Sequence, residues 1–112
     1  MKRYSSVIGV KQEKIKEYTE LHANAWPEVL EMIKKANIRN YSIYLRELEK
    51  GKFYLFSYFE YVGDDFQADQ AMMAANPMTQ KWRSLCCPCH TPIELRGKDE
   101  WWATMEEVFH SD

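Results

Sequence analysis

The sequence predicts an α+β fold of the ferredoxin-like type, in which helices cover one face of an antiparallel sheet. Two observations predict it. Period-two and helical hydrophobic patterns follow one another in the order strand, helix, strand, strand, helix, strand. The second and third strands are separated by a short turn and pair naturally as a hairpin. With 112 residues the chain has the length of one domain, and we expect residues 1–112 to form it.

The first half of the chain is predicted to hold a strand, a long helical stretch and the hairpin. Residues 3–10 alternate as a strand does, and residues 11–36 place apolar side chains every three or four positions. Pro27 is expected to interrupt the helical stretch, because its ring excludes the carbonyl group one turn earlier. The hairpin strands are predicted at 40–47 and 53–61.

The second half is predicted to hold two helices, a loop and a last strand. Asp64 or Asp65 is expected to cap the first helix, and a proline opens the second helix at 77–84. Residues 86–100 contain two prolines and a glycine and are predicted to form a long loop. A short strand or strand-like tail is predicted at 104–109.

The third strand is apolar or aromatic on both of its faces. One face carries Phe53, Leu55 and Phe59, and the other carries Tyr54, Phe56 and Tyr58. Helices can cover only one face of the sheet, so the other face needs a second partner. A second copy of the chain is the simplest such partner, and we therefore expect a homodimer.

Charge and hydropathy exclude several classes of protein. The net charge is -2 and no basic block occurs, so nucleic-acid binding is not expected. No apolar stretch approaches the ~20 residues that span a membrane. The residues that follow Met1 do not resemble an export signal, which leads us to expect a cytoplasmic protein. Its three cysteines are then expected to be reduced thiols.

Cys86, Cys87, Cys89 and His90 form a segment whose spacing matches covalent haem attachment. The same residues also suggest a redox pair, or a zinc site that recruits a distant ligand such as His110. A haem- or metal-binding module is therefore one alternative function. We expect no metal and no cofactor here, because haem attachment normally accompanies export and the loop lacks a thioredoxin-like context. An incidental cysteine-rich loop is the simpler interpretation.

A histidine on the apolar side of the first helix is the leading catalytic candidate. His22 lies one turn after Tyr18 and one turn before Trp26, and Tyr41 lies on the following strand. Imidazole changes charge near neutral pH, and phenols can donate or accept hydrogen bonds. A tryptophan face such as that of Trp82 suits the C–H surface of a sugar ring. These residue types can move a proton onto and off a neutral oxygen without a metal or cofactor.

At these residues the chain resembles the L-rhamnose mutarotases. The matching segments are Tyr18-x-x-x-His22, Trp26-Pro27-Glu28, Asn40-Tyr41-Ser42-Ile43-Tyr44-Leu45, Gln80-Lys81-Trp82 and Glu106-Glu107-Val108-Phe109. The resemblance implies a dimeric ferredoxin-like α/β barrel that interconverts the pyranose anomers of a 6-deoxy sugar, with a monosaccharide as its substrate. It also implies that the catalytic residues are His22, Tyr18 and Tyr41, and that Trp82, Trp26 and Arg83 bind the sugar.

Arg83 departs from the family pattern, in which a second tryptophan follows Trp82. The loop at 86–100 is also longer than in the rhamnose enzymes, and this longer form is similar to a branch associated with L-fucose. The substrate is therefore expected to be an L-6-deoxyhexose, either L-rhamnose or L-fucose. A small dimeric monooxygenase is the rival enzyme, on fold analogy alone.

Overall fold

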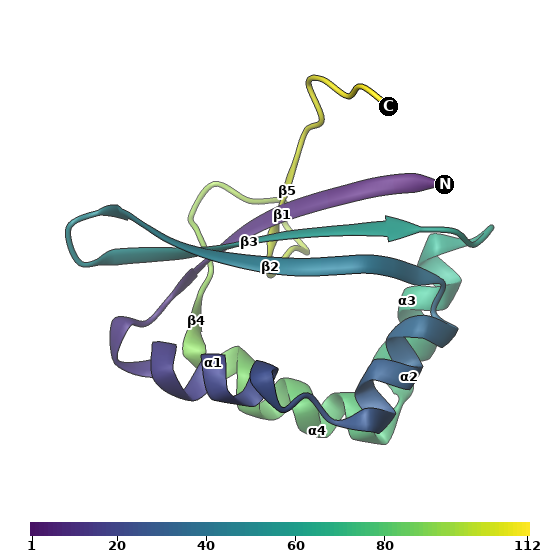
Figure 1. Cartoon of the computed structure of the whole chain (residues 1–112), viewed down its shortest axis with the longest axis horizontal. Coiled ribbons are helices and arrows are strands. Elements are labelled where there is room, and N and C mark those ends of the chain that lie inside the picture. Colours follow the sequence, from purple (N-terminus) through teal and green to yellow (C-terminus); the bar gives the residue numbers. More distant parts are fainter.

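The computed structural model describes residues 1–112 and contains five strands and four α-helices. The strands are β1 (Lys2–Val10), β2 (Ile38–Glu49), β3 (Lys52–Tyr61), β4 (His90–Thr91) and β5 (Ala103–Met105). The helices are α1 (Ile15–Ala23), α2 (Pro27–Lys35), α3 (Phe66–Ala75) and α4 (Pro77–Cys86), with short 3-10 helices at Gln12–Lys14 and Cys87–Cys89. Figure 1 shows the sheet as one layer and the helices as a second layer on one side of it. No helix has both the length and the apolar character that a membrane crossing requires.

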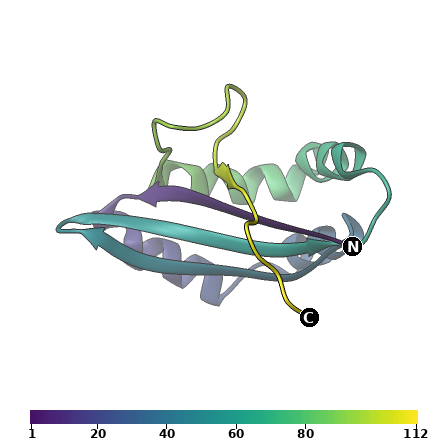
Figure 2. The ribbon, with the colours of Figure 1, turned by 90° about the horizontal axis from the view of Figure 1, so that it is seen from above.

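The sheet has the strand order β2-β3-β1-β4, and each neighbouring pair is antiparallel. Strand β5 also pairs with β1, farther along the edge that β4 occupies. The first and third strands of the chain are therefore central, which is the ferredoxin-like order (Figure 2). This topology confirms the predicted fold class.

The helices begin where the sequence predicts. Pro27 occupies the first turn of α2, where its missing N–H group would have no partner in any case. The Asp65 side chain accepts a hydrogen bond from the Ala68 N–H group at 3.1 Å and caps α3. Asn76 caps α4 in the same way, through the Thr79 N–H group at 2.9 Å. The predicted break at Pro27 and the cap at Asp65 are both confirmed.

One face of the sheet, called the inner face here, packs on the helices. Ile8 and Leu55 lie opposite one another on β1 and β3 and are 0% and 3% exposed. They form the main core with Val10 at the end of β1 and with residues from α1, α4 and the adjoining short helix, which are Tyr18, Cys86 and Cys89. Removal of this apolar surface from water stabilises the fold by ~25 cal/mol per Å2.

A β-bulge at Asn40 decides which way β2 presents its side chains. The register with β3 shifts there by one residue, and Asn40 has a left-handed backbone with φ 51°. Ile38 and Tyr41 can therefore both face inward, although strict alternation would place them on opposite faces. Asparagine tolerates this conformation better than most residues, and its side chain donates to Glu60 at 2.7 Å.

The prediction that residues 86–100 form only a loop is wrong in its first part, because the short helix Cys87–Cys89 and strand β4 lie there. Thr91 of β4 pairs with Gly9, and a side chain at Gly9 would lie 2.5 Å from the Thr91 carbonyl oxygen. The Lys11 N–H group also donates to the Cys89 carbonyl at 2.9 Å. The cysteine-rich segment is thereby fastened to the end of β1, a contact between residues nearly eighty positions apart that no local pattern predicts.

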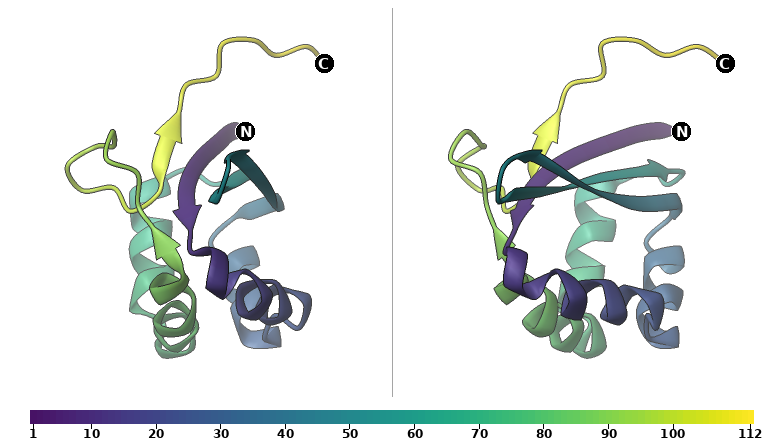
Figure 3. Two further views of the ribbon diagram at one scale, coloured as in Figure 1. Left: turned by 90° about the vertical axis from the view of Figure 1, so that its left-hand side faces the viewer. Right: turned by 60° about the vertical axis from the view of Figure 1, so that its left-hand side comes forward.

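The predicted strand at 104–109 is correct only in its first part. Regular structure ends at Met105, and residues 106–112 form an extended tail on the side of the sheet away from the helices (Figures 1 and 3). Arg3 holds the start of this tail through Glu107, with Nε and Oε2 3.0 Å apart. Val108 and Phe109 are 89% and 82% exposed.

Candidate active site

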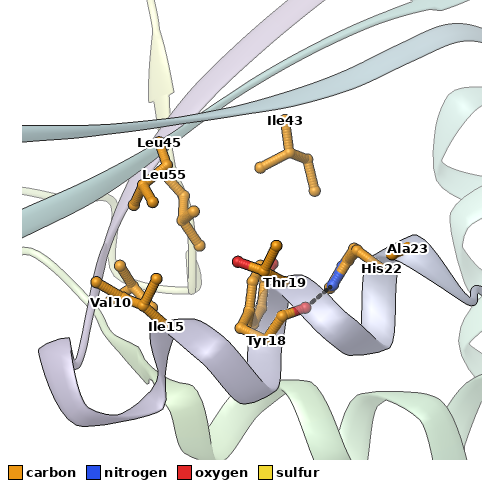
Figure 4. Close-up of a pocket in the computed structure, with 9 residues that line it drawn as sticks. All are labelled: Val10, Ile15, Tyr18, Thr19, His22, Ala23, Ile43, Leu45 and Leu55. Carbon is orange, nitrogen blue, oxygen red and sulfur yellow. Dashed lines mark hydrogen bonds between the residues drawn. The ribbon is translucent and has the colours of Figure 1, made fainter.

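A cavity of about 410 Å3 lies between α1 and the inner face of the hairpin. Figure 4 shows its walls, with side chains of α1 on one side and those of β2 and β3 on the other. Its lining residues are Val10, Ile15, Tyr18, Thr19, His22, Ala23, Ile43, Leu45 and Leu55. The walls are mainly apolar, and Tyr18 and His22 bring to them a phenol and an imidazole. The volume falls in the range of small-molecule sites, which is ~300–1,000 Å3.

Tyr18 and His22 lie one turn apart on α1, with their rings stacked and their centroids 4.2 Å apart. The His22 Nδ1 atom lies 2.9 Å from the Tyr18 carbonyl oxygen. A carbonyl oxygen can only accept, so Nδ1 of a neutral His22 carries the hydrogen and Nε2 keeps its lone pair. Burial lowers the pKa of His22, against a smaller rise from this hydrogen bond, which favours the neutral ring. The helix thus fixes His22 as a proton acceptor.

The Tyr18 hydroxyl is held as an uncharged group. Tyr18 is 5% exposed, and burial raises the pKa of its phenol, with a further rise from the neighbouring Tyr41. Its oxygen lies 3.2 Å from Nε2 of the equally buried His90. Tyr18 is therefore a neutral phenol at neutral pH, with a hydrogen that it can donate.

Tyr41 reaches the same region from β2. Its ring packs on Phe59 with centroids 5.5 Å apart. Both rings lie on the inner face, to which the Asn40 bulge turns the Tyr41 side chain. Although 42% of the residue is exposed, burial of the hydroxyl raises the pKa of Tyr41, and the Arg83 guanidinium partly opposes this rise. Tyr41 and Arg83 are thus electrostatic neighbours beside the cavity, but neither belongs to its lining.

The two predicted sugar-stacking tryptophans form a wall behind His22. The Trp82 and His22 rings meet edge to face with centroids 5.2 Å apart, and Trp26 packs on Trp82 at the same distance. The Lys81 ammonium group lies 5.9 Å from the Trp26 ring centroid. The structure therefore joins Trp26 and Trp82 to His22, outside the residues that line the cavity.

His90 is the site residue that sequence reasoning missed. The spacing of the cysteines drew attention to its role as a haem or metal ligand, but both of its ring nitrogens are engaged elsewhere. Nε2 meets the Tyr18 hydroxyl, and Nδ1 lies 3.0 Å from the indole Nε1 of Trp101. Only the pairing of β4 with β1 brings His90 to Tyr18, so no signal in the sequence could have found it.

The haem- or metal-binding alternative is not favoured by this arrangement. Cys86 and Cys89 pack in the main core, and burial raises the pKa of the Cys86 thiol to about 12. His110, the suggested distant ligand, lies 2.9 Å from Asp112 in the tail. No group of three or more His, Cys, Asp and Glu side chains is arranged to hold a metal ion.

Comparison with known proteins gives one consistent result. The family model for L-rhamnose mutarotase matches residues 3–111. The chain is 35% identical to the L-rhamnose mutarotase of Bacillus subtilis (strain 168) and 32% identical to that of Oceanobacillus iheyensis, and in both cases the match covers 100% of each chain. These relatives lend no support to the monooxygenase alternative.

Two solved structures share the fold. An L-rhamnose mutarotase from Formosa agariphila superposes with a TM-score of 0.73 at 21% identity, over 100% of both chains. Tetracenomycin F2 cyclase from Streptomyces glaucescens superposes with a TM-score of 0.68 at 15% identity, over 99% of this chain and 96% of the cyclase. At such identities these likenesses bear on the fold alone.

The buried histidines predict a loss of stability in mild acid. Burial lowers the pKa of His90 to about 4, against ~6.5 in an unfolded chain. Between these values the unfolded chain binds a proton that the folded chain does not, so the free energy of unfolding falls as the pH falls. The expected slope is ~1.4 kcal/mol per pH unit for one group.

Urea unfolding between pH 7 and pH 5 measures this slope. His90→Gln should make it shallower without abolishing it, because burial also lowers the pKa of His22. His110→Gln, in the exposed tail, is the matched control and should keep the wild-type slope. An unchanged slope in His90→Gln would contradict the prediction.

Proposed function

The chain belongs to the L-rhamnose mutarotase family, and we propose that it interconverts the α and β pyranose anomers of L-rhamnose by acid–base catalysis between His22 and Tyr18. As a member of this family it is an isomerase. The observation that carries the mechanism is the pairing of an imidazole lone pair with a neutral phenol on one wall of a monosaccharide-sized cavity.

Opening of the sugar ring needs one proton acceptor and one proton donor. His22 Nε2 removes the proton from the anomeric hydroxyl, and the C1–O5 bond breaks with its electron pair passing to the ring oxygen O5. Tyr18 donates its phenolic proton to that oxygen. The products are an open-chain aldehyde, an imidazolium and a phenolate, so atoms and charges balance without a cofactor.

Closure on the other face gives the second anomer and restores the enzyme. Rotation about the C1–C2 bond presents the opposite face of the aldehyde to the C5 hydroxyl. That hydroxyl returns its proton to the Tyr18 phenolate as it attacks C1, and the His22 imidazolium protonates the carbonyl oxygen. The stacked rings of Tyr18 and His22 keep the two transient charges close together, which lowers the cost of their separation.

The walls of the cavity suit a 6-deoxy sugar. Ile43, Leu45 and Leu55 offer apolar surface for the methyl group that replaces a hydroxymethyl group. Tyr41 and Arg83, electrostatic neighbours beside the cavity, are assigned to the ring hydroxyls. Trp82 of α4 packs on His22, and Trp26, which immediately precedes α2, packs on Trp82. Both tryptophans are assigned to the border of the sugar site. L-Fucose, which differs from L-rhamnose in the configuration of ring hydroxyls, is the second substrate to be considered.

A homodimer is part of the same proposal. The face of the sheet away from the helices, called the outer face here, has no covering element in the single chain (Figure 1). It carries the 65% exposed Tyr44, which lies opposite Phe56. The C-terminal tail, whose residues Val108 and Phe109 are exposed, runs on the same side of the sheet (Figure 1). A second copy that brings its own outer face and tail would bury all of this surface and close the barrel that the sheet begins.

The substrate is tested by anomer exchange, measured by saturation-transfer NMR. L-Rhamnose and L-fucose should both exchange above their uncatalysed rates, with L-rhamnose ahead, whereas D-glucose should exchange less. A mismatched buried hydroxyl costs ~1–3 kcal/mol, which is enough to separate the sugars. If D-glucose exchanged fastest, the 6-deoxy assignment would be wrong, and if no sugar exchanged, the proposed function would fail.

His22→Ala tests the acid–base assignment. The variant should fold and lose enzyme-dependent exchange by ~100-fold or more, the range of positioned acid–base catalysis. His110→Ala makes the same chemical change in the exposed tail and should keep the wild-type rate. A folded His22→Ala protein with wild-type exchange would remove His22 from the mechanism.

Light scattering at micromolar concentration tests the dimer. The wild-type protein should show about twice the 13.4 kDa mass of one chain. Tyr44→Glu places a charge on the outer face and should shift the equilibrium to monomer. Leu30→Glu, at a 53% exposed position on α2, is the matched control and should leave the dimer intact. A monomeric wild-type protein would contradict this part of the proposal.

A further inference from the structure

We infer that His90 and Trp101 form a positioning pair that turns the Tyr18 hydroxyl hydrogen toward the cavity. This inference rests on the proposed function, because it explains how Tyr18 becomes the proton donor of that reaction. Neither residue lines the cavity. They stand behind Tyr18, in a hydrogen-bonded chain that runs from the Trp101 indole through the His90 imidazole to the phenol.

Trp101 determines which atom donates in each hydrogen bond of this series. An indole Nε1–H group can donate but cannot accept. Since it lies 3.0 Å from His90 Nδ1, that nitrogen must be the acceptor and carry no hydrogen. A neutral His90 then carries its hydrogen on Nε2, which lies 3.2 Å from the Tyr18 oxygen. His90 therefore donates to Tyr18.

Donation by His90 fixes what Tyr18 can do. With one lone pair of its oxygen occupied by His90, the phenol directs its own hydrogen to the other side, where the cavity lies. A sugar ring oxygen carries no hydrogen and can only accept. It therefore needs a hydroxyl group whose hydrogen points into the cavity, as that of Tyr18 does. When Tyr18 gives up its proton, the His90 N–H group still donates to the phenolate and stabilises it. His90 keeps its own proton throughout, so it is a positioning residue.

The opposite tautomer of His90 would defeat this arrangement. With the hydrogen on Nδ1, the bare Nε2 would accept the Tyr18 hydrogen and point it away from the cavity. The indole N–H group of Trp101 would also lose its acceptor. Trp101 thus selects the tautomer in which Tyr18 faces the sugar as a donor.

Both members of the pair are held by backbone contacts outside the site. His90 is fastened by the pairing of β4 with the end of β1. The loop before Trp101 is closed by Arg96, whose guanidinium donates to the carbonyl groups of Ile93 at 2.6 Å and Glu100 at 2.9 Å. The Glu100 carboxylate accepts from the Gly97 N–H group at 2.8 Å. These bonds position the indole, which is itself 44% exposed at the surface.

The tautomer of His90 can be observed without any assay of activity. Long-range proton–nitrogen correlation spectra of isotope-labelled protein at pH 7 should show a protonated Nε2 and a bare Nδ1 for His90. Trp101→Phe should weaken this preference. Trp102→Phe is the matched control and should retain it, because Trp102 packs edge-on against His90 with centroids 5.4 Å apart and makes no hydrogen bond to it. A hydrogen on Nδ1 in the wild-type protein would overturn the inference.

Anomer exchange of L-rhamnose then tests the consequence. His90→Leu should lower kcat by ~10- to 100-fold and leave KM within about threefold of the wild-type value. The direction of the Tyr18 hydroxyl hydrogen matters for proton transfer and not for binding of the sugar. His90→Gln, whose amide can donate at the position of Nε2, should recover most of the loss. Equal losses in His90→Leu and His90→Gln, or none in either, would overturn the positioning role.

The two tests separate this inference from the proposed function. If the wild-type protein did not exchange L-rhamnose, the proposed function would fail, while the spectrum would still report the tautomer. If the wild-type protein exchanged L-rhamnose but His90 carried its hydrogen on Nδ1, only the inference would fail. Thermal unfolding of each variant shows whether a loss of activity reflects a loss of folded protein.

Discussion

The burial of one phenol, Tyr18, is the constraint on which the site depends. A hydroxyl removed from water must find a hydrogen-bond partner, and Tyr18 is 5% exposed. Its hydroxyl meets His90, its carbonyl group accepts from His22, and its ring stacks on the His22 ring. The α1 segment, the β4 segment and the cavity therefore converge on one residue. The Tyr18 carbonyl sets the hydrogen position of His22, and the Tyr18 hydroxyl meets His90, whose hydrogen position follows from Trp101.

The same arrangement matches the modest demands of the proposed reaction. Opening of a hemiacetal needs a proton removed and a proton delivered, and the uncatalysed reaction already proceeds in water. Burial keeps His22 and Tyr18 uncharged, so each is ready for one transfer. In the proposed mechanism the two transfers together leave one positive and one negative ring in contact, and this contact limits the cost of separating charge in a partly apolar cavity.

The two faces of the sheet differ in what they contact. The inner face builds the core and the cavity, and the Asn40 bulge adds Tyr41 to it by shifting the alternation of β2. The outer face carries the exposed Tyr44, is the side of the sheet along which the tail runs, and is the surface on which we propose that a second copy packs. The proposed catalytic site and the proposed dimer surface thus lie on opposite sides of one sheet, so a substitution on the outer face need not disturb the site.

The sequence by itself determined the fold class, the helix starts and the first pair of catalytic candidates. Those features depend on local patterns: the cap at Asp65, the proline at the head of α2, and the one-turn spacing of Tyr18 and His22. Only the tertiary structure decided the role of His90, which in the sequence belongs to a cysteine motif. Its partners Tyr18 and Trp101 are 72 and 11 residues away, and no periodicity reports a contact made through the pairing of β4 with β1. The hydrogen on His90 is placed by that contact, and local sequence carries no information about it.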